Sequence, residues 1–264
     1  MKILFTSDLH LHYGYCDEVL RTLMGEVERS NPDVLAISGD VSDMGERNAY
    51  LFFSAFDLPV VFCLGNHEFV YDTVDGTLGK YRAWREQAAG HGVKNAHCLD
   101  IEGHFDACGV RFYGNVLWYD GSLYNGGDPR PYLDHIWERW LDCKIRDFDP
   151  VKENRRCVEQ IKAEQRRAGK RKSVLLTHCV PLRGLNRFDE ETPLSIPNCY
   201  SGMHDLFGFC HVHPDAALCG HTHMRANLEY HYKYRGIEKD IMCLNSGNDY
   251  YSHTGRVVCD EVEI

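Results

Sequence analysis

Metal-binding side chains recur along this chain directly after short apolar runs, and no other feature of the sequence constrains the fold as strongly. The clusters are Asp8-Leu9-His10, Gly39-Asp40, Gly65-Asn66-His67-Glu68, Thr177-His178 and Gly220-His221-Thr222-His223. The runs that precede them have the length and composition of buried strands and lie at residues 2–7, 33–38, 59–64, 173–177 and 216–219. Groups that follow neighbouring parallel strands meet at one edge of a sheet. The sequence therefore predicts one composite metal site and favours a metal-dependent hydrolase.

Composition excludes several classes of protein. The 264 residues, 44% of them apolar, suffice for a sizeable core. A net charge of -10 argues against broad attraction to nucleic acid, long duplex included, or to anionic membranes. The longest apolar stretches fall far short of the roughly 20 residues that cross a bilayer. Because the amino terminus passes directly into a predicted strand without a secretory signal, we expect a cytoplasmic protein with no membrane partner.

The twelve cysteines are scattered, and no two form a Cys-x-x-Cys pair. This spacing weakens the case for a zinc ribbon or a thioredoxin-like redox centre. We expect reduced thiols, with Cys63, Cys219 and Cys243 packed as small core residues in apolar runs. Cys179 stands beside His178, but core packing is favoured over a place near the metals.

The order of the predicted elements indicates an α/β fold. Apolar residues recur at helical spacing over residues 16–30 and 48–56, between the first three predicted strands, which gives a β-α-β-α-β pattern typical of parallel strands. Further helices are predicted at residues 78–89 and 151–167, strands at residues 96–99 and 110–116, a long loop at residues 121–131, and antiparallel tail strands at residues 226–234, 241–244 and 256–262. Because the first and last clusters must share one site, we expect a single domain over residues 1–264 with two packed sheets.

The donor types restrict the metal. Asp8 and His10 are two residues apart, so an extended backbone would direct both side chains to one face. Asp40 has two oxygens with which it can bridge two ions, and Asn66 offers an amide oxygen. Nitrogen donors come from His178, His221 and His223. This mixture is too rich in nitrogen for calcium or magnesium and lacks thiolate, which leaves manganese, iron or zinc.

Five segments resemble, in order, the five signature blocks of the calcineurin-like metallophosphoesterases. They are Asp8-x-His10, Gly39-Asp40-x-x-Asp43, Gly65-Asn66-His67-Glu68, His178 and Gly220-His221-x-His223. The resemblance implies a four-layer α-β-β-α sandwich with two central mixed β-sheets and two divalent or mixed-valence metal ions. One ion would take Asp8, His10, Asp40 and His223, and the other Asp40, Asn66, His178 and His221.

The resemblance also implies a reaction. A hydroxide that bridges the ions together with Asp40 would attack phosphorus directly. His67 would be the catalytic histidine, not a ligand, and would assist the leaving group. Glu68 stands where many members have Asp, and we expect it to support the ligand loop, while Asp43 would support that loop or orient His67.

Other polar residues have two readings each. His12 lies at the pocket rim or in solvent, and His204 is a candidate substrate contact. Arg183 and Arg187 are candidate phosphate contacts, but ion pairs with the acidic residues 189–191 are slightly favoured. The basic residues 166–172 are typical of a solvated helix end. Asn115, Trp118 and Tyr119 would line a pocket for a base or pack in the core.

These observations favour a phosphodiesterase acting on a nucleotide or similar small molecule. The alternatives are a phosphomonoesterase or protein phosphatase and, from another class, a catalytically silent metal-binding scaffold. The sequence does not indicate an oligomeric state.

Overall fold

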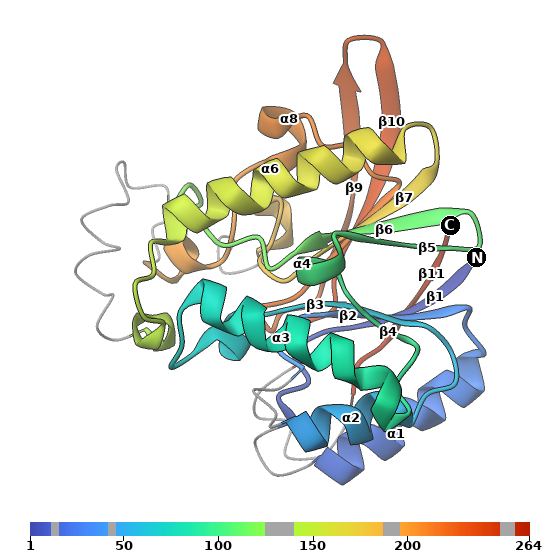
Figure 1. The fold of residues 1–264 in the computed structure, drawn as a ribbon. Helices are drawn as coiled ribbons and strands as arrows, with labels where there is room; N and C mark the ends of the chain where they lie inside the picture. Colours follow the sequence, from blue (N-terminus) through green and yellow to red (C-terminus); the bar gives the residue numbers. More distant parts are fainter. Residues whose placement is uncertain (12–15, 42–45, 125–139, 187–195, 249–256) are drawn as a thin grey trace.

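Two stacked β-sheets form the centre of the molecule, with helices on their outer faces (Figure 1). The computed structural model describes residues 1–11, 16–41, 46–124, 140–186, 196–248 and 257–264. One sheet has the order β11-β1-β2-β3-β4 and comprises β1 (Lys2–Thr6), β2 (Val34–Ser38), β3 (Val60–Cys63), β4 (Ala96–Cys98) and β11 (Asp260–Glu263). The other has the order β5-β6-β7-β8-β10-β9 and comprises β5 (His104–Ala107), β6 (Val110–Asn115), β7 (Lys172–Thr177), β8 (Ala216–Cys219), β9 (Ala226–Tyr234) and β10 (Ile237–Asn245).

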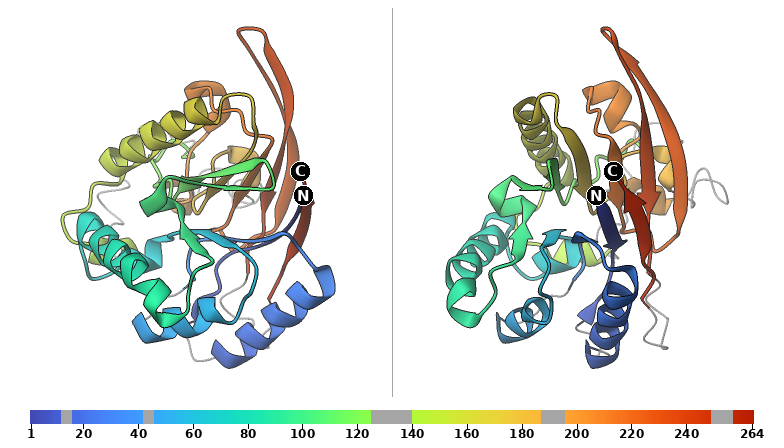
Figure 2. Two further views of the ribbon diagram at one scale, coloured as in Figure 1. Left: turned by 45° about the vertical axis from the view of Figure 1, so that its right-hand side comes forward. Right: turned by 90° about the vertical axis from the view of Figure 1, so that its right-hand side faces the viewer.

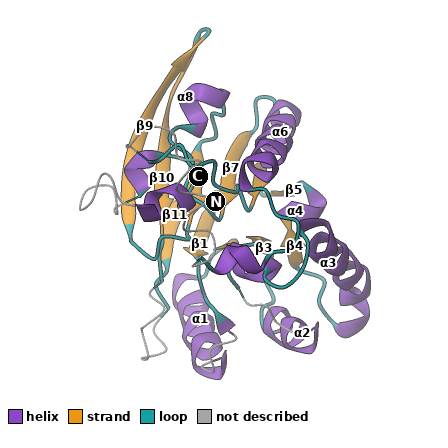
Figure 3. Ribbon diagram, turned by 90° about the vertical axis from the view of Figure 1, so that its left-hand side faces the viewer, coloured by secondary structure: helices purple, strands orange, loops and turns teal. Residues whose placement is uncertain are grey.

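Helices cover the outer faces of both sheets and complete four layers (Figure 3). The α-helices are α1 (Cys16–Ser30), α2 (Glu46–Ser54), α3 (Val74–Ala88), α4 (Leu99–Glu102), α6 (Pro150–Ala168) and α8 (Leu206–Cys210). Short 3-10 helices are η2 (Asn66–Phe69), η3 (Ala89–His91), η5 (Leu141–Lys144), η6 (Arg183–Leu185) and η7 (Ile196–Tyr200). None of the described helices is long and apolar enough to cross a bilayer. The predicted α-β-β-α sandwich with two mixed sheets is confirmed.

Each central strand is buried on both faces, which explains why its sequence reads as a continuous apolar run. Ile3 and Phe5 of β1 face the other sheet, where they join a cluster that includes Phe112 of β6 and Leu176 of β7. Leu4, which points the opposite way, belongs to the larger cluster beneath the helices. The strands that carry the candidate ligands are therefore held rigidly from both sides.

The predicted β-α-β-α-β unit is confirmed, because β1, β2 and β3 are parallel neighbours connected through α1 and α2. Two predictions were wrong at a boundary, since α3 begins at Val74 and not at residue 78, and β10 begins at Ile237 and not at residue 241. Thr73 caps this helix by accepting a hydrogen bond from Gly76 N at 3.0 Å. The short elements α4 and β5 were not predicted, because few residues give too weak a periodic signal.

The prediction of an antiparallel tail was only partly right. β9 and β10 form an antiparallel hairpin that reaches beyond the body of the molecule (Figure 2), but β10 also pairs in parallel with β8. β11 joins the other sheet beside β1, where Lys2 pairs with Glu263. An alternating apolar pattern identifies a strand but carries no information about its partner, so the sequence could not show this separation.

The cysteines follow the prediction of a thiol-containing core. Every cysteine whose side chain is described is a free thiol. Cys63, Cys219 and Cys243 are fully buried, as is Cys179. Burial raises the pKa of the Cys179 thiol well above its usual value, so this sulfur is an apolar packing group.

Asp100, in α4, joins the two sheets close to the ends of their central strands. Its Oδ2 accepts a hydrogen bond from Leu64 N, after β3, at 2.7 Å, and its Oδ1 accepts one from Val116 N, after β6, at 3.0 Å. Burial raises the pKa of this carboxyl to about 6. The carboxylate thus holds the start of one candidate ligand loop against the second sheet.

We expect Asp100→Ala to lower the free energy of unfolding by about 2–4 kcal/mol, because two backbone N–H groups lose their acceptor. The raised pKa means that the folded state binds this proton more tightly than the unfolded state. Its contribution to stability is therefore complete below about pH 4 and is lost as the pH rises through about 6. Urea unfolding in EDTA at pH 4 and pH 7 would test this, and a difference between variant and wild type that does not shrink at pH 7 would contradict it.

Candidate metal centre

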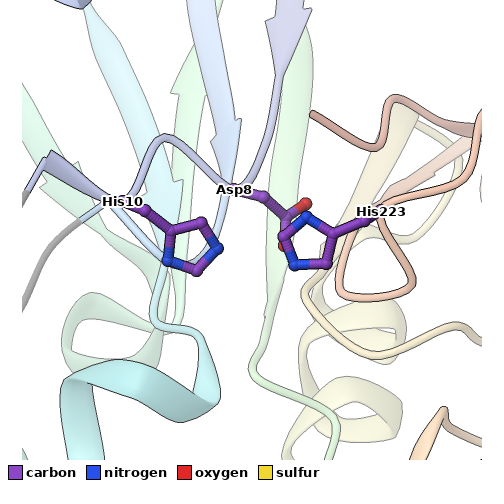
Figure 4. Close-up of side chains that lie close together, drawn as sticks. All are labelled: Asp8, His10 and His223. Atoms are coloured by element: carbon purple, nitrogen blue, oxygen red, sulfur yellow. The ribbon is translucent and has the colours of Figure 1, made fainter. Parts of the chain in front are cut away.

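Five loops bring the predicted ligands to one end of the stacked sheets. Asp8 and His10 follow β1, Asp40 follows β2, Asn66 and His67 open η2 after β3, His178 follows β7, and His221 and His223 follow β8. Figure 4 shows Asp8 and His10 from the first loop and His223 from the last directed into the same space. The structure therefore brings together all eight predicted site residues, from loops on both sheets.

The backbone at these loops is not extended, contrary to the sequence-based expectation for Asp8 and His10. Asp8 has φ 52°, His10 φ 44° and Asp40 φ 48°, all in the left-handed region that non-glycine residues seldom adopt. The turns are held by backbone hydrogen bonds between the loops, from Asp8 N to Gly39 O at 3.1 Å and from His10 N to Asp40 O at 2.9 Å. Such conformations persist only where the surroundings determine them, and they are frequent at functional sites.

Two glycines leave room for the carboxylates. A Cβ atom at Gly65 would lie 2.0 Å from Asp40 Oδ1, and one at Gly220 would lie 2.5 Å from Asp8 Oδ2. Any side chain at these positions would occupy the space of a candidate ligand. The glycine before Asn66 and the glycine before His221 are therefore steric requirements of the site.

Asp40 lies between two groups of donors. Its Oδ2 is 3.6 Å from His10 Nε2 and 3.4 Å from His178 Nε2. On the side of His10, Asp8 Oδ1 lies 3.7 Å from His223 Nε2. Atoms of Asp8, His10 and His223 come within 4.8 Å of one another, as do atoms of Asp8, Asp40 and His178.

The second group gathers around the amide oxygen of Asn66. This oxygen lies 3.0 Å from His178 Nε2 and 3.1 Å from His221 Nδ1, and the two nitrogens are 3.2 Å apart. Donor atoms about 2.1 Å from one ion lie roughly 3–3.5 Å apart in tetrahedral or octahedral geometry. Asp40 Oδ2 is buried, and none of the described residues donates a hydrogen bond to it. The residues present therefore fit transition-metal ions in both groups.

Backbone carbonyls set the orientation of the imidazoles. His178 Nδ1 lies 2.8 Å from Ser38 O, and His221 Nε2 lies 2.7 Å from Tyr200 O. His223 Nδ1 contacts Asn248 O. A nitrogen that donates to a carbonyl leaves the opposite nitrogen with its lone pair toward the site. The second ring nitrogen of each histidine thus selects the tautomer that a metal ligand requires.

His67 occupies a different position from the other histidines. Its backbone N donates to Asp40 Oδ1 at 3.0 Å, its Nε2 lies 3.8 Å from Asp40 Oδ2, and its ring meets the His10 ring edge-on at 4.7 Å. Atoms of His10, Asp40 and His67 also come within 4.8 Å of one another. Its assignment as a catalytic group and not a ligand therefore stays a prediction.

Burial and neighbouring charges act against each other at the ionisable groups of the site. Burial alone would raise the pKa of Asp40, but the nearby charges of His178 and His67 hold it well below its usual value. Burial would likewise lower the pKa of His178, but the Asp40 carboxylate raises it. Burial and the charge of His178 lower the pKa of His221 to about 3. At neutral pH the protein alone therefore pairs a protonated His178 with an ionised Asp40, beside a neutral His221.

We expect metal loading to release at least one proton for each chain at pH 7, because an ion must displace the proton from His178 before this nitrogen can bind it. The apparent affinity should rise with pH, since a higher pH removes the competing proton. Calorimetric titration with Mn²⁺ in buffers of different ionisation enthalpy would count the protons. An enthalpy that does not depend on the buffer would contradict the expectation.

Of the residues that support the candidate ligands, only some were predicted from the sequence. Glu68 behaves as expected, because its Oε2 accepts from Gly65 N at 2.6 Å and from Asp40 N at 3.2 Å. Asn248 was not predicted, yet its Nδ2 donates to Thr6 Oγ1 at 3.0 Å while its carbonyl contacts His223. Asp142, which accepts from Asn66 Nδ2 at 2.8 Å, was also missed. Neither residue stands in a signature block or beside one, so no local signal identifies them.

Three residues for which a pocket wall and core packing were both considered lie in the interior. Asn115, Trp118 and Tyr119 are buried, which favours core packing over an open pocket for a base. Trp118 packs against Phe69 and Phe148.

The other polar residues singled out in the sequence have contacts of their own. Arg183 N donates to His204 O at 2.9 Å, and the His204 ring stacks on Phe209. At the basic helix end, Arg167 pairs with Glu164, and Arg171 pairs with Asp106. The predictions for His12, Asp43, Arg187 and the acidic residues 189–191, and most of the predicted loop at 121–131, lie outside the described residues.

Comparison with known proteins identifies the family. The family model described as calcineurin-like phosphoesterase matches residues 1–225, which include every predicted ligand and His67. The chain belongs to this family. A calcineurin-like phosphoesterase is a hydrolase of phosphoesters, and in this member the matched region carries a His/Asp cluster suited to metal ions. The sequence matched none of the curated proteins with which it was compared.

Solved structures share the calcineurin-like architecture. The chain is similar to phosphopantetheinyl hydrolase (PptH) from Mycobacterium tuberculosis, with a TM-score of 0.63 and 16% identity over 99% of this chain and 95% of that chain. It is also similar to the protein TT1561 of Thermus thermophilus, with a TM-score of 0.55 and 14% identity over 99% of each chain. At these identities the likeness shows the fold alone.

Proposed function

We propose that this chain is a dinuclear metal-dependent phosphodiesterase that acts on a nucleotide or a similar small molecule. The observation that carries the proposal is the position of Asp40, whose Oδ2 lies within 3.4–3.8 Å of His178, His10 and His67. One carboxylate thus serves two donor groups, with a further histidine at its side. This arrangement suits two ions about 3.5–4 Å apart.

The ligand sets follow from the two groups. Asp8, His10, Asp40 and His223 would hold what we call the first ion, and Asp40, Asn66, His178 and His221 the second ion. When bound, the two ions would supply an acidified water molecule and neutralise phosphoryl charge. The native pair would be manganese, iron or zinc, because the donors combine imidazole nitrogen with oxygen and lack thiolate.

His67 would act on the leaving side of the phosphoester. Its backbone bond to Asp40 Oδ1 fixes the start of η2, so the imidazole stays beside the bridging carboxylate. As an imidazolium it would donate its proton to the departing alkoxide, which contributes most where the leaving group is a poor one. The His67 side chain is itself buried, which limits its contact with bulk water.

A panel of esters tests the proposal. Wild type, loaded in turn with Mn²⁺, Fe²⁺ and Zn²⁺, would be assayed with bis-p-nitrophenyl phosphate, p-nitrophenyl phosphate, nucleotide diesters and a phosphopantetheinyl ester. The last belongs in the panel because a protein of similar fold is a phosphopantetheinyl hydrolase. We expect a kcat/KM for diesters at least about tenfold above that for monoesters, a difference of about 1.4 kcal/mol in the barrier.

Other outcomes assign the alternatives. A preference for monoesters by the same margin overturns the diesterase proposal in favour of a phosphomonoesterase or protein phosphatase. Binding of metal without turnover of any ester, under all three metals, identifies a silent scaffold. Asp40→Ala, prepared in parallel, measures contaminating phosphatase activity.

A further inference from the structure

A buried carboxylate outside the signature blocks holds the side chain of Asn66. Asp142, in η5, is fully buried. Its Oδ1 accepts a hydrogen bond from Asn66 Nδ2 at 2.8 Å, and its Oδ2 accepts one from Tyr119 OH at 2.9 Å. No cationic side chain among the described residues forms an ion pair with it. Burial of a carboxylate without an ion pair costs free energy, so the two hydrogen bonds that it accepts need a structural explanation.

The direction of the Asn66 amide depends on this contact. The oxygen and the NH₂ group of an asparagine have nearly the same shape, so hydrogen-bond partners decide which way the amide points. The Asp142 Oδ1 atom accepts the hydrogen bond, and Asp142 therefore selects the NH₂ end of the amide. The amide oxygen is left facing His178 Nε2 at 3.0 Å and His221 Nδ1 at 3.1 Å. Only this oxygen, and not the NH₂ group, can bind a cation.

The same contacts continue to a second candidate ligand. Tyr119 meets the ring of Tyr200 edge-on, with the centroids 5.3 Å apart. The carbonyl of Tyr200 in turn lies 2.7 Å from His221 Nε2. Asp142 hydrogen-bonds to Asn66 directly but reaches His221 only through the ring contact of Tyr119 with Tyr200, so its orienting effect is exerted through Asn66. A change at Asp142 thus acts on the second donor group and not on the first.

We propose that Asp142, supported by Tyr119, is a positioning residue that directs the amide oxygen of Asn66 toward the second ion. This inference rests on the proposed dinuclear site, to which it adds a residue outside the signature blocks. Asp142 orients a candidate ligand through its direct hydrogen bond to Asn66 and does not bind an ion itself. Its effect should therefore disappear when the Asn66 side chain is absent.

A double-mutant cycle on metal binding tests this dependence. Mn²⁺ affinities of the two sites would be measured by calorimetry and bound metal by mass spectrometry, for wild type, Asp142→Ala, Asn66→Ala and the double variant. We expect Asp142→Ala to weaken the second ion by about 10–100-fold and to leave the first unchanged. In the Asn66→Ala background the same replacement should cause no further loss.

Matched variants separate positioning from general damage. Glu164→Gln changes another buried carboxylate, on α6, which pairs with His104 and Arg167 away from the site, and both ions should bind as in wild type. If Asp142→Ala does not fold, Asp142→Asn keeps the volume but offers one oxygen for two donors, and it should weaken the second ion by about tenfold. Thermal unfolding in EDTA would establish that each variant is folded.

Four results would overturn the inference, three of them in the variants. They are wild-type affinity for the second ion in the Asp142 variants, an equal loss for both ions, or an undiminished loss in the Asn66→Ala background. Wild type that fails to bind two ions would overturn it as well. Failure of the proposed function has a different signature, because wild type would then bind two ions, respond to Asp142→Ala as expected and hydrolyse no phosphoester.

Discussion

Asp40→Ala is expected to abolish metal loading and to lower kcat/KM for a phosphodiester by more than a thousandfold, about 4 kcal/mol of transition-state stabilisation. The reason is geometric, because Asp40 Oδ2 faces His10 Nε2 at 3.6 Å and His178 Nε2 at 3.4 Å. Metal analysis of the dialysed protein, together with turnover of bis-p-nitrophenyl phosphate, would measure both effects.

Two control variants sharpen this result. In the wild type, His67 N donates to Asp40 Oδ1 at 3.0 Å, and Asp40→Asn keeps an oxygen that can accept this hydrogen bond. The variant removes only the negative charge. Metal loss in Asp40→Asn would therefore assign the effect to the charged carboxylate. Asp106→Asn alters a carboxylate on β5 that pairs with Arg111 outside the site, and it should retain metal and activity. Two bound ions and full activity in Asp40→Ala would contradict the assignment of Asp40 as a metal ligand.

His67→Ala is expected to retain both ions and to slow the hydrolysis of esters with poor leaving groups by about 10²–10⁴-fold. We expect the metal to be retained because residue 67 reaches Asp40 Oδ1 through its backbone N, which alanine preserves. The loss should be smaller for p-nitrophenol, which departs readily without a proton. A series of diesters with leaving groups of graded pKa would show a steeper dependence in the variant than in wild type.

His67→Gln is the matched control, because it keeps a polar side chain of similar length that cannot supply an acidic proton. It should resemble His67→Ala in the leaving-group series. Loss of metal from either variant would show instead that His67 is a ligand, a role that its place within 4.8 Å of His10 and Asp40 also permits. A uniform loss across all leaving groups would contradict the acid role.

Much of the fold was predictable because the central strands are buried on both faces. Residues 216–219, for example, form an apolar run that coincides with β8. The helix predicted at residues 16–30 also coincides with α1, whose apolar residues keep one face toward the sheet. β11 marks the limit of such reasoning, because its pairing with β1 depends on contacts between opposite ends of the chain.

The residues of the site likewise include some that were predictable from the sequence and some that were not. Glu68 could be assigned a supporting role because it lies within a block, three residues from the Gly65 N that it accepts from. Asp142 could not, because it contacts Asn66 across 76 positions of sequence and follows no motif. The left-handed backbone at Asp8 and His10 was likewise hidden, since it is imposed by hydrogen bonds to the loop after β2.

The sequence by itself determined the strand order of the first unit, the donor types and the family, because apolar runs and the groups that end them are local properties of the chain. Only the tertiary structure decided which donor atoms lie within reach of one another and what holds them there. The physical reason is that these distances depend on how two sheets stack and on buried hydrogen bonds between distant loops. That Asp40 supplies a carboxylate was predictable from the sequence, whereas its distance to His178 and the contact of Asp142 with Asn66 were decided by the tertiary structure.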